Sequence, residues 1–432
     1  MGTTGLIERV FAWEALDSRG TPTVACEVSL SSGATGTVIV PSGASTGRHE
    51  AHELRDGGQR YGGRGVQQAV RNVNDVLGPA VKGHDAGDQR GLDGLLREAD
   101  GTANLSALGA NAVLAVSLAA LIARAHHEST DVWRLLLDGR DPLMPLPMVN
   151  IVSGGAHAGG AVDIQDVLVV PVGASSFAEA IEWSWRVRLA TAQACEARRL
   201  PATLAADEGG LGPRLDSNRQ ALELVAEGLE RSGLQPGSDV AIAVDVAATQ
   251  LWRDGSYRLE AEGRTVDASG LLAEIESWCD TWPVVSVEDP VADDDWDGWS
   301  EASRRLGPRV QLLGDDLFAT NAGRLSRGAA DGIANAVLIK PNQNGTVTGT
   351  SDVLEQARTA GYATVVSARS GETEDSWLSD LAVGWRAGQI KVGSTTRSER
   401  TAKWNRLLRI EAEPGGVAFA GRQALGGSHV DV

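Results

Sequence analysis

The sequence predicts an α/β protein in which a (β/α)8-type barrel follows an α+β capping domain. Eight short apolar runs succeed one another from residue 143 onward, separated by segments long enough to form helices. The last five runs end at polar residues spaced 24 to 27 positions apart, namely Glu288, Asp315, Lys340, Ser367 and Lys391. Repeated strand and helix units of this length are typical of a barrel whose catalytic groups lie at the C-terminal ends of its strands.

The first 142 residues predict a different unit. Three β-rich runs, at 8–16, 21–30 and 33–40, precede helical patterns near 66–82, 87–99 and 108–127. The eight barrel strands are expected at LPMVNIV, DVLVVPV, VAIAVDV, VVSVED, VQLLGDD, NAVLIK, ATVVSAR and GQIKVG. We therefore expect a capping domain at residues 1–142 and a barrel domain at residues 143–432.

Composition excludes several classes of function. The net charge of −18 and the pI near 4.9 disfavour binding to nucleic acid. Three cysteines without a CxxC pair indicate a reducing compartment and no structural zinc. The N-terminal residues lack the pattern of a signal peptide, and the apolar run at 111–123 is too short to span a bilayer. The sequence thus predicts a soluble cytoplasmic protein without membrane or nucleic-acid partners.

Three acidic residues end three successive expected strands: Asp245 in AVDVA, Glu288 in VVSVEDP and Asp315 in LLGDDL. Any one of them alone would more simply be a helix cap. Together they meet at one mouth of the barrel, and carboxylate oxygens without His or Cys favour Mg²⁺. The sequence therefore predicts a magnesium site.

Two of the chain's four lysines, Lys340 and Lys391, end two further strands. A lysine beside a divalent cation is pushed toward its neutral form, so one of them can serve as a base while the other pairs with the acids. Across the mouth, Asp207 and Glu208 in AADEGGLGP offer an acid that could protonate a leaving group.

A series of longer motifs follows in order along the chain: EALDSRGTPTV, VPSGASTGRHEAHELRDG, LGANAVLAVSLA, GGAHAGG, DEGG, DVAAT, EDP, GDDLFATN, LIKPNQNGT, RSGETED, GQIKVG, RSER and LLRIE. Over nearly its whole length the chain resembles enolases, the phosphopyruvate hydratases of glycolysis. The resemblance implies an enolase-type barrel, hydro-lyase activity on a 2-phosphoglycerate-like acid, and two Mg²⁺ ions in each active site. It also implies a small anionic substrate and a homodimer.

The resemblance assigns roles to particular residues. It makes Asp245, Glu288 and Asp315 the ligands of the first Mg²⁺, with Ser45 helping to hold the second. It makes Lys340 the base that takes the C2 proton and Glu208 the acid that acts on the departing hydroxyl. Substrate binding is assigned to Lys391 at the carboxylate, to Arg369 and Ser370 at the phosphoryl group, and to His157, which closes over that group.

Two departures from the family pattern fall in the pocket. Where the family has SHRSGETED this chain has SARSGETED, so Ala368 replaces a histidine. In DIQDV, the family's QE pair becomes Gln165 and Asp166, which the resemblance places among the substrate-binding residues. The acid is one methylene shorter than in the family, and it belongs to the group near Glu208 and the leaving hydroxyl. Both changes remove side-chain volume from the pocket.

Three interpretations of these departures remain open. The one that we favour from sequence is a specialised paralogue acting on a bulkier carboxyphosphono analogue of phosphoglycerate, as in phosphonate natural-product biosynthesis. The second is an ordinary glycolytic enolase that tolerates both changes. The third is a catalytically silent relative retained for binding, which the intact acids and lysines disfavour.

Overall fold

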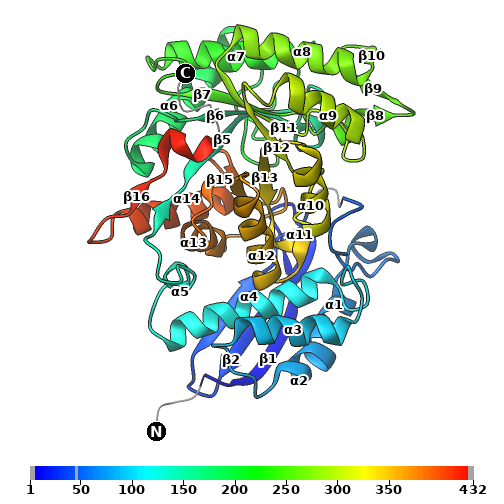
Figure 1. Ribbon diagram of the computed structural model, residues 1–432, viewed down its shortest axis with the longest axis vertical. Helices are drawn as coiled ribbons and strands as arrows, with labels where there is room; N and C mark the ends of the chain where they lie inside the picture. Colours follow the sequence, from blue (N-terminus) through cyan, green and yellow to red (C-terminus); the bar gives the residue numbers. More distant parts are fainter. Residues whose placement is uncertain (1–4, 44–46, 427–432) are drawn as a thin grey trace.

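The computed structural model describes residues 5–43 and 47–426 and divides into a cap and a barrel (Figure 1). The cap contains an antiparallel sheet of three strands in the order β1 (Ile7–Leu16), β2 (Pro22–Leu30) and β3 (Thr35–Ile39). The helices of the cap are α1 (Gln67–Asn72), α2 (Gly78–Val81), α3 (Gln89–Asp100) and α4 (Ala110–His127), and a π-helical turn joins α1 to α2. The three expected strands and three expected helical regions are all present.

Helix α4 forms the core of the cap. It packs on β2 and β3, and apolar residues surround most of its circumference. It has 18 residues, more than the apolar run at 111–123, and by length and composition alone it could cross a membrane. However, 78% of this span is buried inside the protein, so α4 is a core helix.

All eight expected barrel strands form, and they close into one sheet in the order β11-β12-β13-β14-β15-β5-β6-β7. Their bounds are β5 (Leu146–Ser153), β6 (Asp166–Val170), β7 (Ala241–Asp245), β11 (Val284–Glu288), β12 (Gln311–Gly314), β13 (Ala336–Ile339), β14 (Ala363–Ser367) and β15 (Gly388–Gly393). The fold class expected from the sequence is confirmed. One strand differs from a barrel of parallel strands: β6 runs antiparallel to both β5 and β7.

The direction of β6 follows from its connections. Only a short segment with a 3-10 turn separates β5 from β6, too short for a crossover helix, whereas two helices, α6 (Phe177–Ala197) and α7 (Asn218–Arg231), lie between β6 and β7. Since β6 is reversed, its first residue Asp166 lies at the same mouth of the barrel as the last residue of β7, Asp245.

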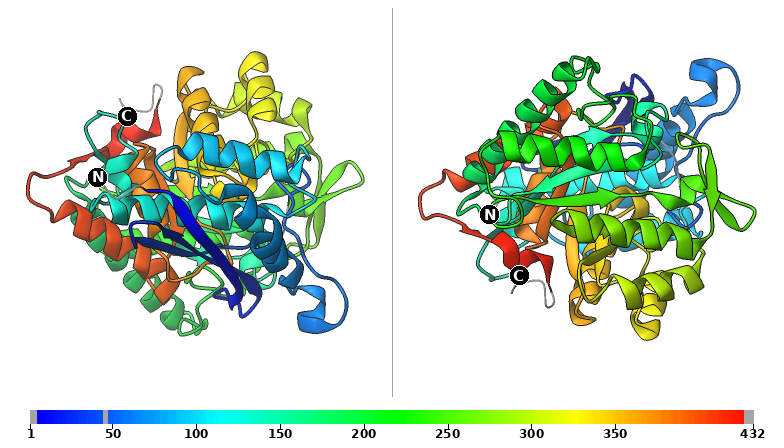
Figure 2. Two further views of the ribbon diagram at one scale, coloured as in Figure 1. Left: turned by 90° about the horizontal axis from the view of Figure 1, so that it is seen from below. Right: turned by 90° about the horizontal axis from the view of Figure 1, so that it is seen from above.

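Further helices surround the strands (Figure 2). They are α8 (Ala268–Thr281), α9 (Trp296–Arg305), α10 (Ala322–Asp331), α11 (Pro341–Asn344), α12 (Val347–Thr359), α13 (Trp377–Gly384) and α14 (Ser398–Glu411), and α5 (Val132–Leu135) leads from the cap to the barrel. The sequence reading missed a small sheet of β8 (Trp252–Arg253), β9 (Ser256–Leu259) and β10 (Arg264–Val266). It also missed the pair β4 (Leu143–Met144) and β16 (Ala418–Phe419).

The cap is bonded to the mouth of the barrel. Ser42 and Gly371 exchange two backbone hydrogen bonds, of 2.8 and 2.9 Å, and Ala51 N donates to Gln343 O at 2.8 Å. At Gly371 an added Cβ would lie 2.5 Å from Asp17 Oδ2, so only glycine permits this approach. The cap therefore covers one side of the barrel mouth.

Candidate active site

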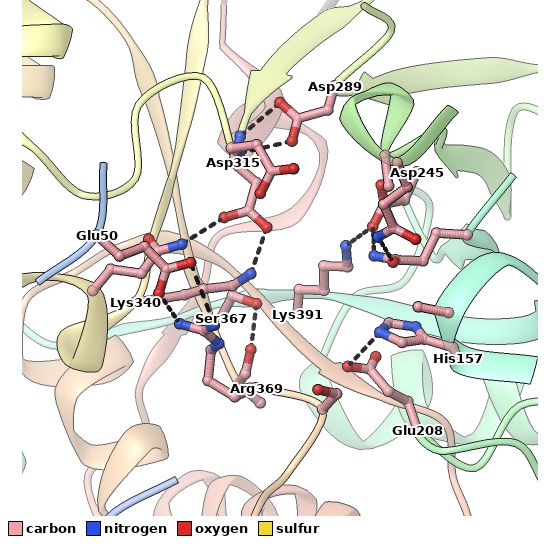
Figure 3. A pocket seen from close by; sticks show the side chains of 18 residues that line it. Glu50, His157, Glu208, Asp245, Asp289, Asp315, Lys340, Ser367, Arg369 and Lys391 are labelled. Atoms are coloured by element: carbon pink, nitrogen blue, oxygen red, sulfur yellow. Dashed lines mark hydrogen bonds and ion pairs between the residues drawn. The ribbon is translucent and has the colours of Figure 1, made fainter. Parts of the chain in front are cut away.

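The residues predicted to act on substrate gather at the barrel mouth beneath the cap (Figure 3). Asp245 and Glu288 end β7 and β11, Asp315 follows β12, and Lys340 follows β13. Lys391 lies within β15, and its side chain reaches the centre of the group. Parallel strand ends converge at this edge, which brings residues far apart in sequence together.

Lys391 joins two of the predicted metal ligands. Its Nζ donates to Asp245 Oδ2 at 2.8 Å and to Glu288 Oε2 at 2.7 Å, and all three side chains are buried. Burial and the neighbouring Asp245 carboxylate raise the pKa of Glu288. Burial would lower the pKa of Lys391, but Asp245 and Glu288 outweigh it and raise that pKa. Lys391 is thus held as a cation between two acids.

Lys340 and Asp315 form a second pair. Lys340 Nζ donates to Asp315 Oδ2 at 2.5 Å, and Gln343 Nε2 donates to Asp315 Oδ1 at 3.1 Å. Burial opposes the charge of Lys340, but Asp315 prevails and raises the lysine's pKa, while Lys340 lowers the pKa of Asp315. A metal ion bound to Asp315 would lower the pKa of Lys340, because a nearby positive charge disfavours the protonated lysine.

The predicted Mg²⁺ ligands are carboxylates, whose oxygens are the donors that a hard divalent ion prefers. Buried Glu288 Oε1 has no hydrogen-bond partner among residues 5–43 and 47–426, so this oxygen has a free ligand position. A group of acids at the mouth whose oxygens lie close enough to share a cation is Asp289, Asp315 and Asp316, which contains only one of the predicted ligands. The carboxylate of Asp289, however, already accepts from the backbone N–H groups of Asp315 and Asp316. Asp245, Glu288 and Asp315 remain the predicted ligand set.

The predicted phosphoryl-binding side is built around Arg369. Its Nη1 lies 2.8 Å from Glu50 Oε2 of the cap and 3.1 Å from Asn342 Oδ1. The buried guanidinium of Arg400 donates to the carbonyl oxygens of Arg369 (2.7 Å) and Ser370 (2.6 Å), which fixes the backbone of both predicted anion-binding residues. The RSER motif that contains Arg400 thus supports the anion side of the pocket.

Glu208 and His157 face one another on the other side of the pocket (Figure 3). His157 Nε2 lies 3.8 Å from Glu208 Oε1, and His157 Nδ1 lies 2.8 Å from Asp166 Oδ2. Burial would lower the pKa of His157, but the two carboxylates raise it to about 9. Burial would raise the pKa of Glu208, but His157 and Arg400 lower it. These shifts favour a proton on the imidazole over one on Glu208.

Of the two predicted binding residues in the DIQDV motif, Gln165 lies on the pocket wall and Asp166 lies behind it. Gln165 lines the pocket, where its Nε2 donates to Asp245 Oδ2 at 3.1 Å and its Oε1 accepts from Gln250 Nε2 at 2.7 Å. Asp166 is fully buried behind His157, and its second oxygen accepts from Asn150 Nδ2 at 2.5 Å. Asp166 reaches the pocket only through His157.

Ala368 lies on the wall of the pocket, as its place in SARSGETED implies. It is 6% exposed, and its backbone N donates to Lys391 O at 2.9 Å. Ser45, expected to hold the second Mg²⁺, lies outside the described residues.

The sequence reading missed three contributors: Glu50, which pairs with Arg369, Gln343, which binds Asp315, and Asp289, which fixes the backbone after β12. All three stand inside the motifs HEAHELRDG, LIKPNQNGT and EDP. The only signal in the sequence for these three residues was that each is a polar residue inside a motif. Their partners could not be read from the sequence, because the contacts join distant segments of the chain.

Comparison with known proteins agrees with this architecture. Residues 7–136 match the family described as "Enolase, N-terminal domain", and residues 141–426 match "Enolase, C-terminal TIM barrel domain". A curated relative, Enolase of Acidothermus cellulolyticus, is 52% identical over 410 residues, which cover 94% of each chain. The capped barrel and these matches define a carbon–oxygen lyase. The chain belongs to the enolase family.

Proposed function

We propose that this protein removes water from 2-phosphoglycerate to give phosphoenolpyruvate. The observation that carries the proposal is the placement of Lys340 and Glu208 on opposite sides of Lys391 (Figure 3). Elimination of water needs a base at C2 and an acid at the C3 oxygen. The 52% identity to a protein named Enolase favours this ordinary reaction over a specialised one.

Each side chain of the site has a separate role in the proposed reaction. Mg²⁺ held by Asp245, Glu288 and Asp315 would supply the positive charge that the substrate carboxylate needs as its C2 proton is lost. Lys340 takes that proton, and Lys391 stabilises the carboxylate because its ammonium is already fixed at the centre of the site. Arg369 and Ser370 hold the phosphoryl group, and Glu208 delivers a proton to the departing hydroxide.

The direct test is the rise in absorbance from phosphoenolpyruvate formation when purified protein meets 2-phosphoglycerate with Mg²⁺. We expect sustained turnover that stops when the metal is chelated. Protein that binds Mg²⁺ but leaves 2-phosphoglycerate unchanged would contradict the proposal.

A second candidate substrate is a larger acid with an extra carboxylate on phosphorus, a carboxyphosphono analogue of phosphoglycerate. Ala368 supports it, because this pocket-lining position carries a methyl group where the family has the larger histidine. The test is to measure kcat/KM for both acids in the wild-type protein and in Ala368→His. A larger substrate predicts a wild-type preference for the analogue that the histidine reverses, whereas equal or better use of 2-phosphoglycerate by wild-type protein removes this candidate.

We also propose that the protein is a cytoplasmic homodimer that joins through its cap. On the outer face of β1, an edge strand, Phe11 and Trp13 are 42% and 36% exposed and stack at 5.7 Å between ring centroids. Exposed aromatic residues on an unpaired strand favour burial against another chain. Light scattering would report a dimer for wild-type protein and a monomer for Trp13→Glu, and a wild-type monomer would contradict this proposal.

A further inference from the structure

The predicted anion-binding residues Arg369 and Ser370 belong to a short loop that follows β14. Together with Ala368 they line the pocket, whereas Glu372 lies behind them and is 1% exposed. One oxygen of Glu372, Oε1, accepts from Arg369 N at 3.1 Å, and the other, Oε2, accepts from Thr373 N at 3.2 Å. The carboxylate thus holds the backbone on both sides of the turn that carries the anion-binding residues.

Lys403 of α14 supplies the opposite charge for this carboxylate. Its Nζ lies 2.7 Å from Glu372 Oε2 and donates to Thr373 O at 2.5 Å, and the lysine is 1% exposed. Arg400, which binds carbonyl oxygens of the same loop, lies three positions earlier on α14, so both cations project from one face of this helix. Helix α14 therefore holds the loop from behind with two buried cations.

An unpaired carboxylate at Glu372 would oppose binding of an anion. In the proposed reaction the phosphoryl group binds to Arg369 and Ser370, which belong to the same turn. Like charges repel strongly where burial limits screening by water and salt. Glu372 can therefore fasten the loop without weakening anion binding only if a cation cancels its charge, and Lys403 is in contact with it.

We propose that Lys403 is a positioning residue for phosphoryl binding, which acts through Glu372. The carboxylate fixes the turn of Arg369 and Ser370, and the ammonium keeps this carboxylate from repelling the phosphoryl group. The inference goes beyond the proposed dehydration and rests on it only for the identity of the anion. Lys403 does not line the pocket, so its effect belongs to anion affinity and not to proton transfer.

The test measures anion affinity directly and through kinetics. Inorganic phosphate is the direct probe, and its weak binding in the presence of Mg²⁺ is followed by ³¹P NMR titration. Steady-state kinetics with 2-phosphoglycerate gives KM and kcat. In Lys403→Met the carboxylate loses its cation, and we expect Kd for phosphate and KM to rise about tenfold or more while kcat changes less than about threefold.

The double variant Glu372→Gln/Lys403→Met removes both charges of the pair. Its amide oxygen can still accept from Arg369 N, so Kd and KM should return to within about fivefold of wild type. Restoration by a second substitution is the result that a charge effect predicts. A double variant that binds phosphate no better than Lys403→Met would overturn the inference.

Glu372→Gln alone gives a test of sign that holds even if Lys403→Met does not fold. In this variant Lys403 keeps its charge and its bond to Thr373 O. We therefore expect phosphate to bind more tightly than in the double variant. A pair that serves folding alone predicts the opposite order, because only the single variant leaves a buried cation without its carboxylate. Binding by Glu372→Gln that is no tighter than binding by the double variant would overturn the inference.

Arg406→Met is the matched control. Arg406 lies three positions after Lys403 on α14 and pairs with buried Asp380 of α13, with 2.6 Å between Nη2 and Oδ1. We expect its unfolding temperature to fall, while KM, kcat and phosphate affinity keep their wild-type values. A loss of phosphate affinity equal to that of Lys403→Met would overturn the inference. Wild-type protein that shows the expected order of phosphate affinities but leaves 2-phosphoglycerate unchanged would overturn the proposed function alone.

Discussion

Arg369 of the barrel and Glu50 of the cap form a buried ion pair, with 2.8 Å between Nη1 and Oε2 and each side chain 6% exposed. Glu50 Oε1 also accepts from Gly47 N at 2.8 Å. The predicted phosphoryl-binding arginine is therefore oriented by a residue from another part of the fold. The cap completes the anion side of the pocket as well as covering it.

Replacing Glu50 by alanine should weaken both stability and binding. Removing one partner of a buried pair leaves an uncompensated charge, so we expect the free energy of unfolding to fall by about 3 to 5 kcal/mol. KM for the phosphorylated substrate should rise as Arg369 loses its orientation. Chemical denaturation and steady-state kinetics measure these effects. Asp352→Ala, which breaks the exposed Arg90–Asp352 pair, is the control and should cost less than about 1 kcal/mol.

Mg²⁺ should stabilise the folded protein through Glu288. An ion that binds only the native state raises stability by about 2.7 kcal/mol at a hundred times its Kd. Thermal unfolding with and without Mg²⁺ should show this rise in wild-type protein and in Asp316→Asn, and should lose it in Glu288→Gln. If the rise were instead lost in Asp316→Asn and kept in Glu288→Gln, the ion would be assigned to the acidic group of Asp289, Asp315 and Asp316.

Lys340 should be required for exchange of the C2 proton. Because a base in the transition state contributes about 10²- to 10⁴-fold, Lys340→Met should lose exchange and turnover by at least this factor. Stabilisation by Mg²⁺ should persist in the same variant, since the predicted metal ligands are untouched. Exposed Lys82 provides the control Lys82→Met, with unchanged rates. Retained C2 exchange in Lys340→Met would move the role of base to another residue.

The sequence predicted the barrel because its strands carry a local signal, an apolar run that ends in a polar residue. It did not predict the reversal of β6, because strand direction depends on how the chain between strands packs. In the same way, Asp245 and Lys340 could be placed by their position at strand ends, whereas β15 continues beyond Lys391 to Gly393. The pairing of Glu50 with Arg369 could not, since 319 positions separate them and only the docking of the cap brings them together.

The pH dependence of stability should report the charge of His157. Its pKa is about 9 in the folded protein, above the value of 6.5 for a free side chain. The protonated ring therefore contributes stability that is fully present below about pH 6.5 and is lost as pH rises through 9. The difference in unfolding free energy between wild-type protein and His157→Gln should shrink by on the order of 3 kcal/mol across this range. Urea denaturation of both proteins at a series of pH values measures this difference. A constant difference between wild-type protein and His157→Gln would mean that Asp166 and Glu208 do not hold the proton on the ring.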